Sequence, residues 1–520
     1  MLLTDHGDRL LNRLRRFRLF IVSATAIIAL LAFATLQQEL ARSVFSGLQD
    51  WFSHNTGWLL ILIMNAALLF AVYLIFSPLA HIRLGGKDAR PEFSRLDWFG
   101  MLFAAGMGIG LLFYSVSEPL QHYATFSPHM DTNADTAQLA METTFLHWGL
   151  HPWAIYALVG LTLGYFHFNA NHPLCFEAPL KELVSRKRAR RIGGFANFAA
   201  VIGTVFGVCT SLGLGTSQAA AGIAQLTGYE SGLWLQMLLI ALVCAVALVS
   251  VLTGLSSGVR RLSKINLLLA GALMLFVLVA GETVFVLKAL GQHVGGYFND
   301  LLTLSTWNET YQGTDWQSSW TVFYWSWWIS WSPFVGMFIA RVSRGRTIRE
   351  YLLGVLLVPS FFNFIWMTVF GANALHLELF QNADFVKTVT QAPNSSLYNF
   401  LEFLPLSTAT IGIAILVVLV FFVTSADSGS LVVATLTSNG RDPSWQQRLF
   451  WMAAIGLVTA VLLRAGGLNA LQSATIASGL PFGLLLLTFI PALLIALRRP
   501  YEEQRVHVRI PREPPREDRA

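Results

Sequence analysis

Charged residues are scarce in this chain, and their scarcity excludes most soluble proteins. Only 12% of the 520 residues are Asp, Glu, Lys or Arg, whereas 54% are hydrophobic, and soluble domains typically carry about 25% charge. The mean hydropathy is +0.56. The few charges are excluded from long apolar runs, and runs of about 20 such residues cross a bilayer as helices. The composition therefore predicts an all-α, polytopic membrane protein.

Cysteine and low-complexity sequence are also nearly absent. The three cysteines, Cys175, Cys209 and Cys244, are scattered along the chain, so they indicate neither a disulfide framework nor a metal site. No low-complexity linker divides the chain, and no soluble domain is indicated. The segment RLLNRLRRFRLF near the start lacks a small-residue cleavage site, so we expect the basic flank of a first span rather than a removed signal peptide.

What the chain does contain is a series of apolar runs, each close to the length of a membrane-spanning helix. We predict twelve spans, numbered 1 to 12 in chain order: 19–36, 57–78, 98–118, 146–166, 195–226, 233–254, 266–287, 321–340, 351–372, 408–428, 448–464 and 473–497.

Lysine and arginine predict the orientation, because cytoplasmic loops carry these residues in excess. If both termini are cytoplasmic, 31 of the 35 Lys and Arg lie on the inner side. Only Arg42, Lys288, Lys387 and Arg464 then lie outside. A missed span would invert every later loop and destroy this split. The pI near 9.3 therefore reflects membrane orientation, and we expect membrane lipid rather than nucleic acid as a partner.

The predicted organisation has five parts. They are a cytoplasmic segment 1–18, two additional helices in 19–97, a first repeat with its outer connection in 98–320, a second repeat in 321–497, and a short cytoplasmic tail 498–520. The outer stretches 119–144, 289–320 and 374–405 are expected to form short surface helices.

Two spans carry residues that break helices. Span 3 has Gly106, Gly108 and Gly110 at alternate positions, and span 8 contains Ser332-Pro333. Glycine lowers helix stability by about 1 kcal/mol relative to alanine, and proline by about 3 kcal/mol. Broken backbone at membrane depth survives only where it lines a cavity, and interrupted helices at matching positions of two repeats mark transporter binding sites. Close helix packing is the alternative explanation of the glycines.

Tryptophan is concentrated in span 8, where Trp325, Trp327, Trp328 and Trp331 fall within YWSWWISWSPF. Such a cluster suits either a lipid-interface belt or a cage for a cation, because aromatic faces bind quaternary ammonium groups. Span 4 adds FLHWGLHPWAIY, in which we expect Pro152 to disturb the helix. Two clusters beside a broken helix favour the cage.

These motifs carry a resemblance. GMGIGLLFYSVSEPL, HWGLHPWAIY, WSWWISWSPFVGMFIARVSRGRTIRE and FFVTSADSGS, in this order, resemble the betaine/choline/carnitine transporter family over about residues 50–495. The resemblance implies twelve transmembrane helices with a leucine-transporter-like core of two inverted five-helix repeats, spans 3–7 and 8–12. It also implies a homotrimer in the bacterial cytoplasmic membrane and no enzymatic activity.

The resemblance also implies roles for individual residues. The substrate's trimethylammonium group would lie in a box of Trp148, Trp153, Tyr156 and Trp328. The other substrate-path residues would be Trp325, Trp327, Trp331, Gly106, Gly108 and Gly110. One co-transported sodium would bind the carbonyls of Ala104, Met107 and Phe421 and the hydroxyls of Thr424 and Ser425. A second would involve Phe334 and a hydroxyl of span 5, from Thr204, Thr210 or Ser211.

Comparison within the resembled family indicates the substrate and the ion. Choline carriers of the family tend to have aspartate where this chain has Gly110, which favours a zwitterion such as glycine betaine. Sodium-independent exchangers place Arg and Met at the sodium positions, whereas span 5 here contains no Arg, Lys or Met. We expect sodium symport, without a prosthetic group. Proton-coupled uptake of choline, or of a sulfonium compound such as dimethylsulfoniopropionate, stays open.

An enzyme is the remote alternative. His147 and His151, with His167 and His172, resemble the histidine boxes of membrane di-iron enzymes. The predicted topology separates these pairs by a span of about 30 Å, which excludes a shared cluster. Glu118 and Asp427, near the ends of spans 3 and 10, are expected to cap helices or to act in gating rather than to relay protons.

Overall fold

The structure, a computed structural model, is built from helices throughout the part that it describes. It covers residues 2–509 apart from 107, 254–255, 312–313, 382 and 439, and it leaves out the side chains at 2–16, 103–106, 129, 251–260 and 500–509. Within these limits the one β-type contact is an isolated antiparallel bridge between Arg83 and Thr347. The all-helical prediction is confirmed.

The first half of the chain contains the two additional helices and the first predicted repeat. Its elements are α1 (Leu2–Leu36), α2 (Gln38–Phe76), η1 (Pro78–His81), α3 (Arg95–Gly106), α4 (Ile109–Phe126), η2 (Ser127–His129), α5 (Asn133–Trp148), α6 (Leu150–Phe168), α7 (Glu177–Leu180), α8 (Arg186–Thr227), α9 (Leu233–Thr253), α10 (Ser256–Ala280), α11 (Thr283–Thr306) and α12 (Trp316–Ser319).

The second predicted repeat begins with the tryptophan-rich helix. Its elements are α13 (Thr321–Val342), α14 (Ile348–Met367), the π-helical turn η3 (Thr368–Ala372), α15 (Asn373–Gln381), α16 (Phe385–Gln391), η4 (Pro393–Ser395), α17 (Ser396–Glu402), α18 (Ser407–Thr437) and α19 (Trp445–Arg509).

Helices occupy all twelve predicted spans. Among the described residues, eight helical stretches are long and apolar enough to cross a membrane. One of them, α19, contains both of the last two predicted spans, and its backbone leaves helical geometry at Gly466 and Gly467. The other predicted spans correspond to the broken pair α3–α4 and to α6 and α13, whose aromatic, histidine and serine side chains lower their mean hydropathy.

The predicted break in the third span is present. Helix α3 ends at Gly106, and α4 begins at Ile109 after an extended Gly108 with φ −154° and ψ 176°. The backbone groups at such a break have no intrahelical partner. Because Gly108 lines an internal cavity, the break lies where irregular backbone is tolerated within a membrane.

The fourth span is interrupted at a glycine rather than at the proline that we predicted. Helix α5 ends at Trp148, Gly149 takes the non-helical angles φ −95° and ψ −131°, and α6 begins at Leu150. Pro152 therefore lies in the first turn of α6, where a missing N–H costs no hydrogen bond. A Cβ at position 149 would lie 2.5 Å from the Phe145 carbonyl oxygen, so the turn requires glycine.

The prediction that Ser332-Pro333 interrupts span 8 is wrong, because α13 runs without a break from Thr321 to Val342. Proline at 333 cannot donate to the carbonyl of Ile329. The hydroxyl of Ser332 donates to that same carbonyl at 2.7 Å and so replaces the lost bond. A serine next to the proline thus keeps the helix continuous.

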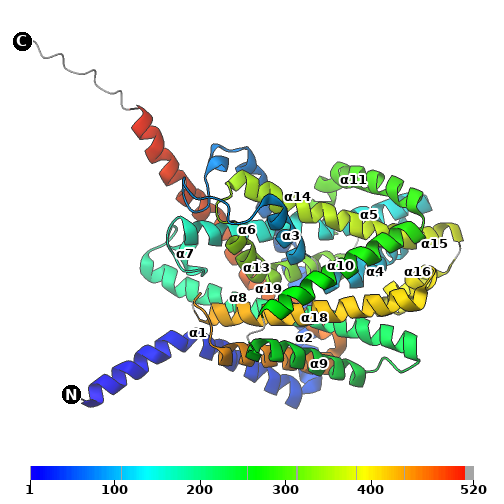
Figure 1. The fold of residues 1–520 in the computed structure, drawn as a ribbon, viewed down its shortest axis with the longest axis horizontal. Helices are drawn as coiled ribbons and strands as arrows, with labels where there is room; N and C mark the ends of the chain where they lie inside the picture. The colour runs from blue at the N-terminus through cyan, green and yellow to red at the C-terminus, as the bar shows by residue number, and fades with distance from the viewer. Residues whose placement is uncertain are drawn as a thin grey trace, which may run out of the picture.

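The two termini lie at the same end of the molecule. The start of α1, the end of α19 and the short helix α7 all lie at one end of the molecule, to the left in Figure 1, whereas α15 and α16 lie at the other end. At the first end Arg344 pairs with Glu92 at 3.0 Å and Arg499 with Glu182 at 2.8 Å. Each pair joins two loops or tails that were predicted to share the inner side.

The core of the molecule is centred on α13. This helix packs most extensively against α6, and also against α8 and α19. Tyr324, Trp325 and Trp327 of α13 are almost completely buried. The sequence feature that suggested a binding site therefore lies inside the helix bundle rather than on a lipid-facing surface.

Candidate functional site: an aromatic cavity at the helix break

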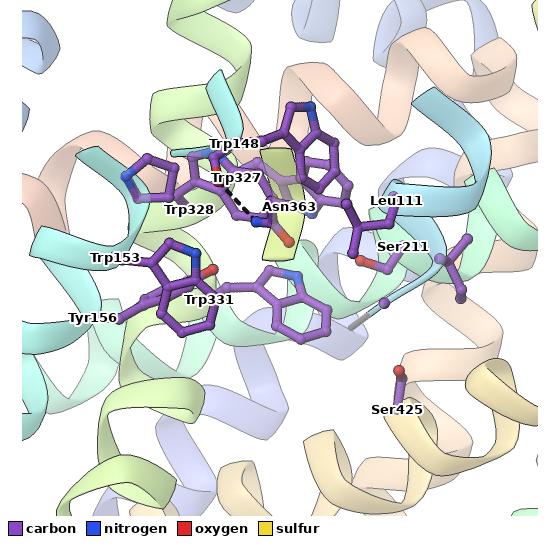
Figure 2. A pocket seen from close by; sticks show the side chains of 14 residues that line it. Leu111, Trp148, Trp153, Tyr156, Ser211, Trp327, Trp328, Trp331, Asn363 and Ser425 are labelled. Atoms are coloured by element: carbon purple, nitrogen blue, oxygen red, sulfur yellow. Dashed lines mark hydrogen bonds between the residues drawn. The ribbon is translucent and has the colours of Figure 1, made fainter. Parts of the chain in front are cut away.

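A cavity of about 40 Å³ lies beside the break between α3 and α4 (Figure 2). Helices α4, α5, α6, α8, α13, α14 and α18 supply its lining, namely Gly108, Ile109, Gly110, Leu111, Trp148, Pro152, Trp153, Tyr156, Ser211, Trp327, Trp328, Trp331, Asn363 and Ser425. This set contains no Asp, Glu, Lys or Arg.

Four aromatic side chains, Trp148, Trp153, Tyr156 and Trp328, form what we call the aromatic cage. Their rings meet nearly at right angles in a continuous series. The angle is 77° between Trp148 and Trp328, 86° between Trp328 and Tyr156, and 83° between Tyr156 and Trp153, with centroids 5.0 to 6.3 Å apart. Perpendicular rings form the adjoining walls of a box, so a group held inside meets aromatic faces on several sides (Figure 2).

The indole N–H groups around the cavity are largely bonded to protein oxygens. Trp148 Nε1 donates to Glu118 at 2.8 Å, Trp328 Nε1 to the His147 carbonyl at 2.9 Å, and Trp327 Nε1 to the Gly207 carbonyl at 3.3 Å. These bonds fix the rings and leave their faces to the cavity. Such a surface attracts a cation through the ring quadrupoles.

Trp331 differs from the other tryptophans of the lining. Its Nε1 is buried and has no hydrogen-bond partner among the described residues. Its ring packs against Phe334 at 5.3 Å. Since Trp331 also lines the cavity, it carries a donor that a ligand oxygen could use.

Gly110 allows the cavity walls to meet. A Cβ at this position would lie 2.7 Å from the Cη2 atoms of both Trp148 and Trp327. Any side chain would therefore displace at least one ring, and the requirement for glycine comes from the tertiary packing. Gly106 is the last residue of α3, immediately before the break.

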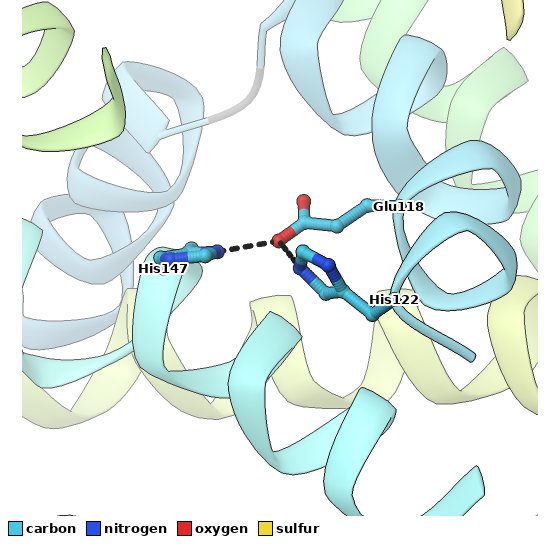
Figure 3. Close-up of side chains that lie close together, drawn as sticks. All are labelled: Glu118, His122 and His147. Atoms are coloured by element: carbon cyan, nitrogen blue, oxygen red, sulfur yellow. Dashed lines mark hydrogen bonds and ion pairs between the residues drawn. The ribbon is translucent and has the colours of Figure 1, made fainter. Parts of the chain in front are cut away.

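A buried carboxylate, that of Glu118, lies between His122 and His147 (Figure 3). Glu118 Oε1 accepts from His147 Nδ1 at 2.7 Å and lies 3.3 Å from His122 Nε2. Its Oε2 accepts from Trp148 Nε1 and from the Tyr324 hydroxyl. An ionised carboxylate can only accept hydrogen bonds, and each of these four neighbouring side chains has an N–H or O–H group that can donate one. The geometry makes Glu118 a positioning residue for Trp148, beyond the capping role that we expected.

Trp325 lies outside the cavity lining. It is buried against the rings of His147 and His151, at 5.7 and 5.6 Å. It precedes all three residues of α13 that line the cavity, Trp327, Trp328 and Trp331.

The residues assigned to a first sodium ion lie partly at the same cavity. Ser425 of α18 lines it together with Gly108. Thr424, the preceding residue, donates to the carbonyls of Val420 and Phe421 at 3.1 and 3.0 Å. Ala104 is in α3, and Met107 lies outside the described residues.

The three hydroxyl candidates on span 5 are placed differently. Ser211 lines the cavity and donates to the Gly207 carbonyl at 3.2 Å. Thr210 instead faces α19, bonding the Leu471 carbonyl at 3.0 Å and the Thr475 hydroxyl at 2.7 Å. Thr204 donates within its own helix to the Ala200 carbonyl. Ser211 is thus the candidate nearest the cage.

Comparison with known proteins identifies the family. The model of the betaine/carnitine/choline family of transporters matches residues 18–502, nearly the whole chain. The chain belongs to this family. It is 42% identical over 479 residues to a glycine betaine transporter of Acinetobacter baylyi, covering 92% of this chain and 73% of the relative.

Two further relatives have the same character. The glycine betaine transporter OpuD of Bacillus subtilis is 40% identical over 488 residues, covering 93% of this chain and 94% of the relative. The osmo-dependent choline transporter BetT2 of Acinetobacter baylyi is 38% identical over 494 residues, covering 94% and 72%. This betaine/carnitine/choline family member is therefore a multi-pass membrane transporter and not an enzyme.

Family membership also removes the support for a di-iron enzyme. In the structure His147 bonds Glu118, His151 lies 3.3 Å from the Asn65 side chain, and His167 lies 2.8 Å from the His172 carbonyl. Glu118, His122 and His147 are close enough to bind one ion, but both carboxylate oxygens already accept from fixed protein donors.

One cavity residue of this transporter was missed by the sequence reasoning. Asn363 is buried on α14, lines the cavity and donates to the Trp148 carbonyl at 2.8 Å. This carbonyl lies at the end of α5, where no further helical turn could bond it. An asparagine in an otherwise apolar span is a signal of function, and it could have indicated the position.

Proposed function

We propose that this transporter imports a quaternary ammonium zwitterion, glycine betaine or a close analogue, by sodium symport. The observation that carries the proposal is the aromatic cage, whose perpendicular rings offer faces while the indole N–H groups of Trp148 and Trp328 are bonded elsewhere. A quaternary ammonium group donates no ordinary hydrogen bonds, so aromatic faces suit it better than oxygen ligands do.

A zwitterion also needs a site for its carboxylate, and two features of the cavity supply one. The first N–H groups of α4, at Ile109 and Gly110, have no partner within that helix, and the helix dipole favours an anion there. The unpartnered Trp331 Nε1 is a further donor. The cage would hold the cationic end, and these donors would hold the anionic end of the same small molecule.

Sodium coupling is supported by the helix break. The last carbonyl groups of α3 have no partner within that helix, and carbonyl oxygens are hard ligands. Ser425 and Gly108 both line the cavity. We infer that Ala104, Met107, Phe421, Thr424 and Ser425 bind one ion and that Phe334 and Ser211 lie near a second. Each sodium that enters at 100 mV contributes about 2.3 kcal/mol from voltage alone.

The second candidate is proton-coupled uptake of choline or of a sulfonium compound such as dimethylsulfoniopropionate. The choline transporter among the relatives favours it as the alternative. It would use the same cage without a carboxylate site. We rank choline or sulfonium uptake second because position 110 is glycine and not the aspartate that choline carriers of the family tend to have.

We further propose the setting in which this transporter works. The twelve spans would lie in a bacterial cytoplasmic membrane with both termini inside, which agrees with the grouping of Arg344–Glu92 and Arg499–Glu182 at the end that holds the termini. Residues 1–18, 19–97, 98–320, 321–497 and 498–520 would form the units predicted above, and three copies would form a homotrimer.

The test is uptake of radiolabelled glycine betaine into proteoliposomes under inward sodium, potassium or proton gradients, with choline assayed in parallel. Trp328→Ala should raise the apparent KM roughly 10- to 30-fold, because a desolvated cation–π contact is worth about 1.4 to 2 kcal/mol. Trp234→Ala is the matched control, since Trp234 is 72% exposed.

The outcomes separate the parts of the proposal. Sodium-dependent betaine uptake that is weakened only by Trp328→Ala supports both the cage and the ion. Uptake driven by protons alone refutes sodium symport and leaves the cage. Equal effects of the two tryptophan variants would refute the cage, and uptake of choline but not betaine would refute the carboxylate site.

A further inference from the structure

A second cavity lies away from the aromatic cage, at the end of the molecule where α1 begins and α19 ends. It has a volume of about 1320 Å³ and lies between α1 and the beginning of α8, with the α7 segment beside it. We call it the basic groove. Six cationic side chains line it: Arg18, Lys181, Arg186, Lys187, Arg190 and Arg191.

These cations are poorly neutralised by the protein. Among the described residues of the lining, Glu177 is the one acidic side chain, and it pairs with Lys181 at 3.6 Å. Within the described part of the chain, no carboxylate pairs within 4 Å with the four groove residues of α8, namely Arg186, Lys187, Arg190 and Arg191. All four are exposed. The groove therefore carries an excess positive charge that an external anion could neutralise.

The rest of the groove is apolar. Leu19, Val22, Phe195 and Phe198 belong to the same lining. Val22 is 48% exposed and Phe195 is 53% exposed, so neither residue is covered by the protein. A soluble anion would make no use of these side chains, because an ion and its hydration shell avoid apolar surfaces.

The change from basic to apolar occurs where two of the predicted spans begin. On α1, Arg18 immediately precedes the apolar run 19–36, and on α8 the basic residues end four positions before Phe195 opens the run 195–226. Both helices thus pass from a cationic to an apolar surface at the same groove. A phospholipid has the same order, with its phosphate at the surface and its acyl chains below.

We propose that the basic groove binds an anionic phospholipid, with its phosphate among the arginine and lysine side chains and its acyl chains along Val22 and Phe195. Basic pockets between transmembrane helices on the cytoplasmic side recognise such headgroups. Arginine binds phosphate oxygens in a bidentate manner. This inference does not depend on the substrate or the coupling ion of the transporter.

Binding can be measured by native mass spectrometry of the full chain in detergent. The protein is titrated with phosphatidylglycerol or with phosphatidylcholine of the same acyl chains. The groove variant carries Arg186→Gln, Lys187→Gln, Arg190→Gln and Arg191→Gln. The matched control carries Arg188→Gln, Arg261→Gln, Lys264→Gln and Arg441→Gln, which removes the same charge from exposed residues outside the groove.

We expect phosphatidylglycerol to bind the native chain at least tenfold more tightly than phosphatidylcholine does. The groove variant should lose this preference, while the control should keep it within about twofold. Size-exclusion profiles and thermal midpoints of both variants confirm that they are folded. Equal losses in the two variants would show general charge attraction and would overturn the proposal.

Two further arms test other occupants. If free glycerol phosphate displaces phosphatidylglycerol at similar concentration, the groove is an ion site and the proposal fails. The chain's own acidic residues in the tail are the other candidate. If removal of residues 510–520 raises phosphatidylglycerol affinity tenfold, the tail is the native occupant and the proposal fails; unchanged affinity supports the lipid.

Discussion

The aromatic cage and the basic groove differ in the interaction that they offer a ligand: the cage offers neutral aromatic faces suited to a cation, and the groove offers cationic side chains suited to an anion. The cavity of the cage is about 40 Å³, is buried among α4, α6 and α13, and has no charged side chain in its lining. The groove is about 1320 Å³ and is lined by six cationic side chains, five of them exposed and one, Lys181, half-buried. Burying an unpaired charge is costly, so the buried site uses neutral aromatic faces and the exposed site can use charge itself.

The one charge beside the cage supports this distinction. Glu118 is buried, and its carboxylate contacts four donors, from His122, His147, Trp148 and Tyr324. A buried charge is tolerated when its hydrogen bonds are complete. The arginines of the groove have no such partners among the described residues, because water already solvates them.

The largest loss of uptake is expected from adding a side chain at Gly110, where two rings of the cavity wall are in close contact. Gly110→Ala places a methyl group 2.7 Å from the rings of both Trp148 and Trp327. Overpacking typically costs about 1 to 3 kcal/mol, and because two rings are affected we expect the upper part of this range, a fall in initial uptake of roughly 100-fold. Gly100→Ala, at a position with nothing within 4 Å, is the control in the same proteoliposome assay. Normal uptake by Gly110→Ala would mean that the rings move freely and that the cage is not preformed.

A smaller effect compares one buried charge with one exposed charge. Glu118→Gln should destabilise the folded protein by about 1.5 to 3 kcal/mol, the value of a hydrogen bond to a charged group. Arg186→Gln removes an exposed charge and should change stability by less than about 0.5 kcal/mol. Thermal unfolding in detergent without added lipid measures both. Equal midpoints for the two variants would contradict the structural role of Glu118.

The smallest effect concerns ionic strength. Raising potassium chloride from 50 to 300 mM at fixed sodium should weaken phosphatidylglycerol binding roughly fivefold, because screening removes about 1 kcal/mol of the charge attraction. Substrate affinity should change by less than about twofold, since the buried rings are hardly screened. A strong salt dependence of the substrate KM would indicate that an exposed charge contributes to the cage.

The sequence predicted most of the fold because its signals are local. Apolar runs of suitable length mark the spans, and Gly106, Gly108 and Gly110 predicted the break between α3 and α4 that the structure contains. The errors also arose from local reasoning. Pro152 was expected to disturb α6 and Pro333 to interrupt α13, yet Gly149 makes the first break and the Ser332 hydroxyl repairs the second.

The sequence predicted which residue types form the candidate site, but it did not predict which of the tryptophan side chains face the cavity. Trp148, Trp153, Tyr156 and Trp328 do gather at one cavity, whereas Trp325, two positions before Trp327, faces His147 and His151. A run of adjacent tryptophans on a helix points in several directions. Only the neighbouring helices decide which rings meet.

By itself, then, the sequence determined that this protein is an all-helical membrane transporter with a glycine-broken helix and a surplus of aromatic residues. Composition and hydropathy suffice for the membrane helices, because the bilayer requires long apolar helices, and the transport function came from motifs that resemble a transporter family. The tertiary structure alone decided that Glu118 anchors Trp148, that Asn363 bonds the end of α5, and that Arg18 joins the arginines of α8 in one groove. These contacts link residues that are tens to hundreds of positions apart, and no local pattern records such distances.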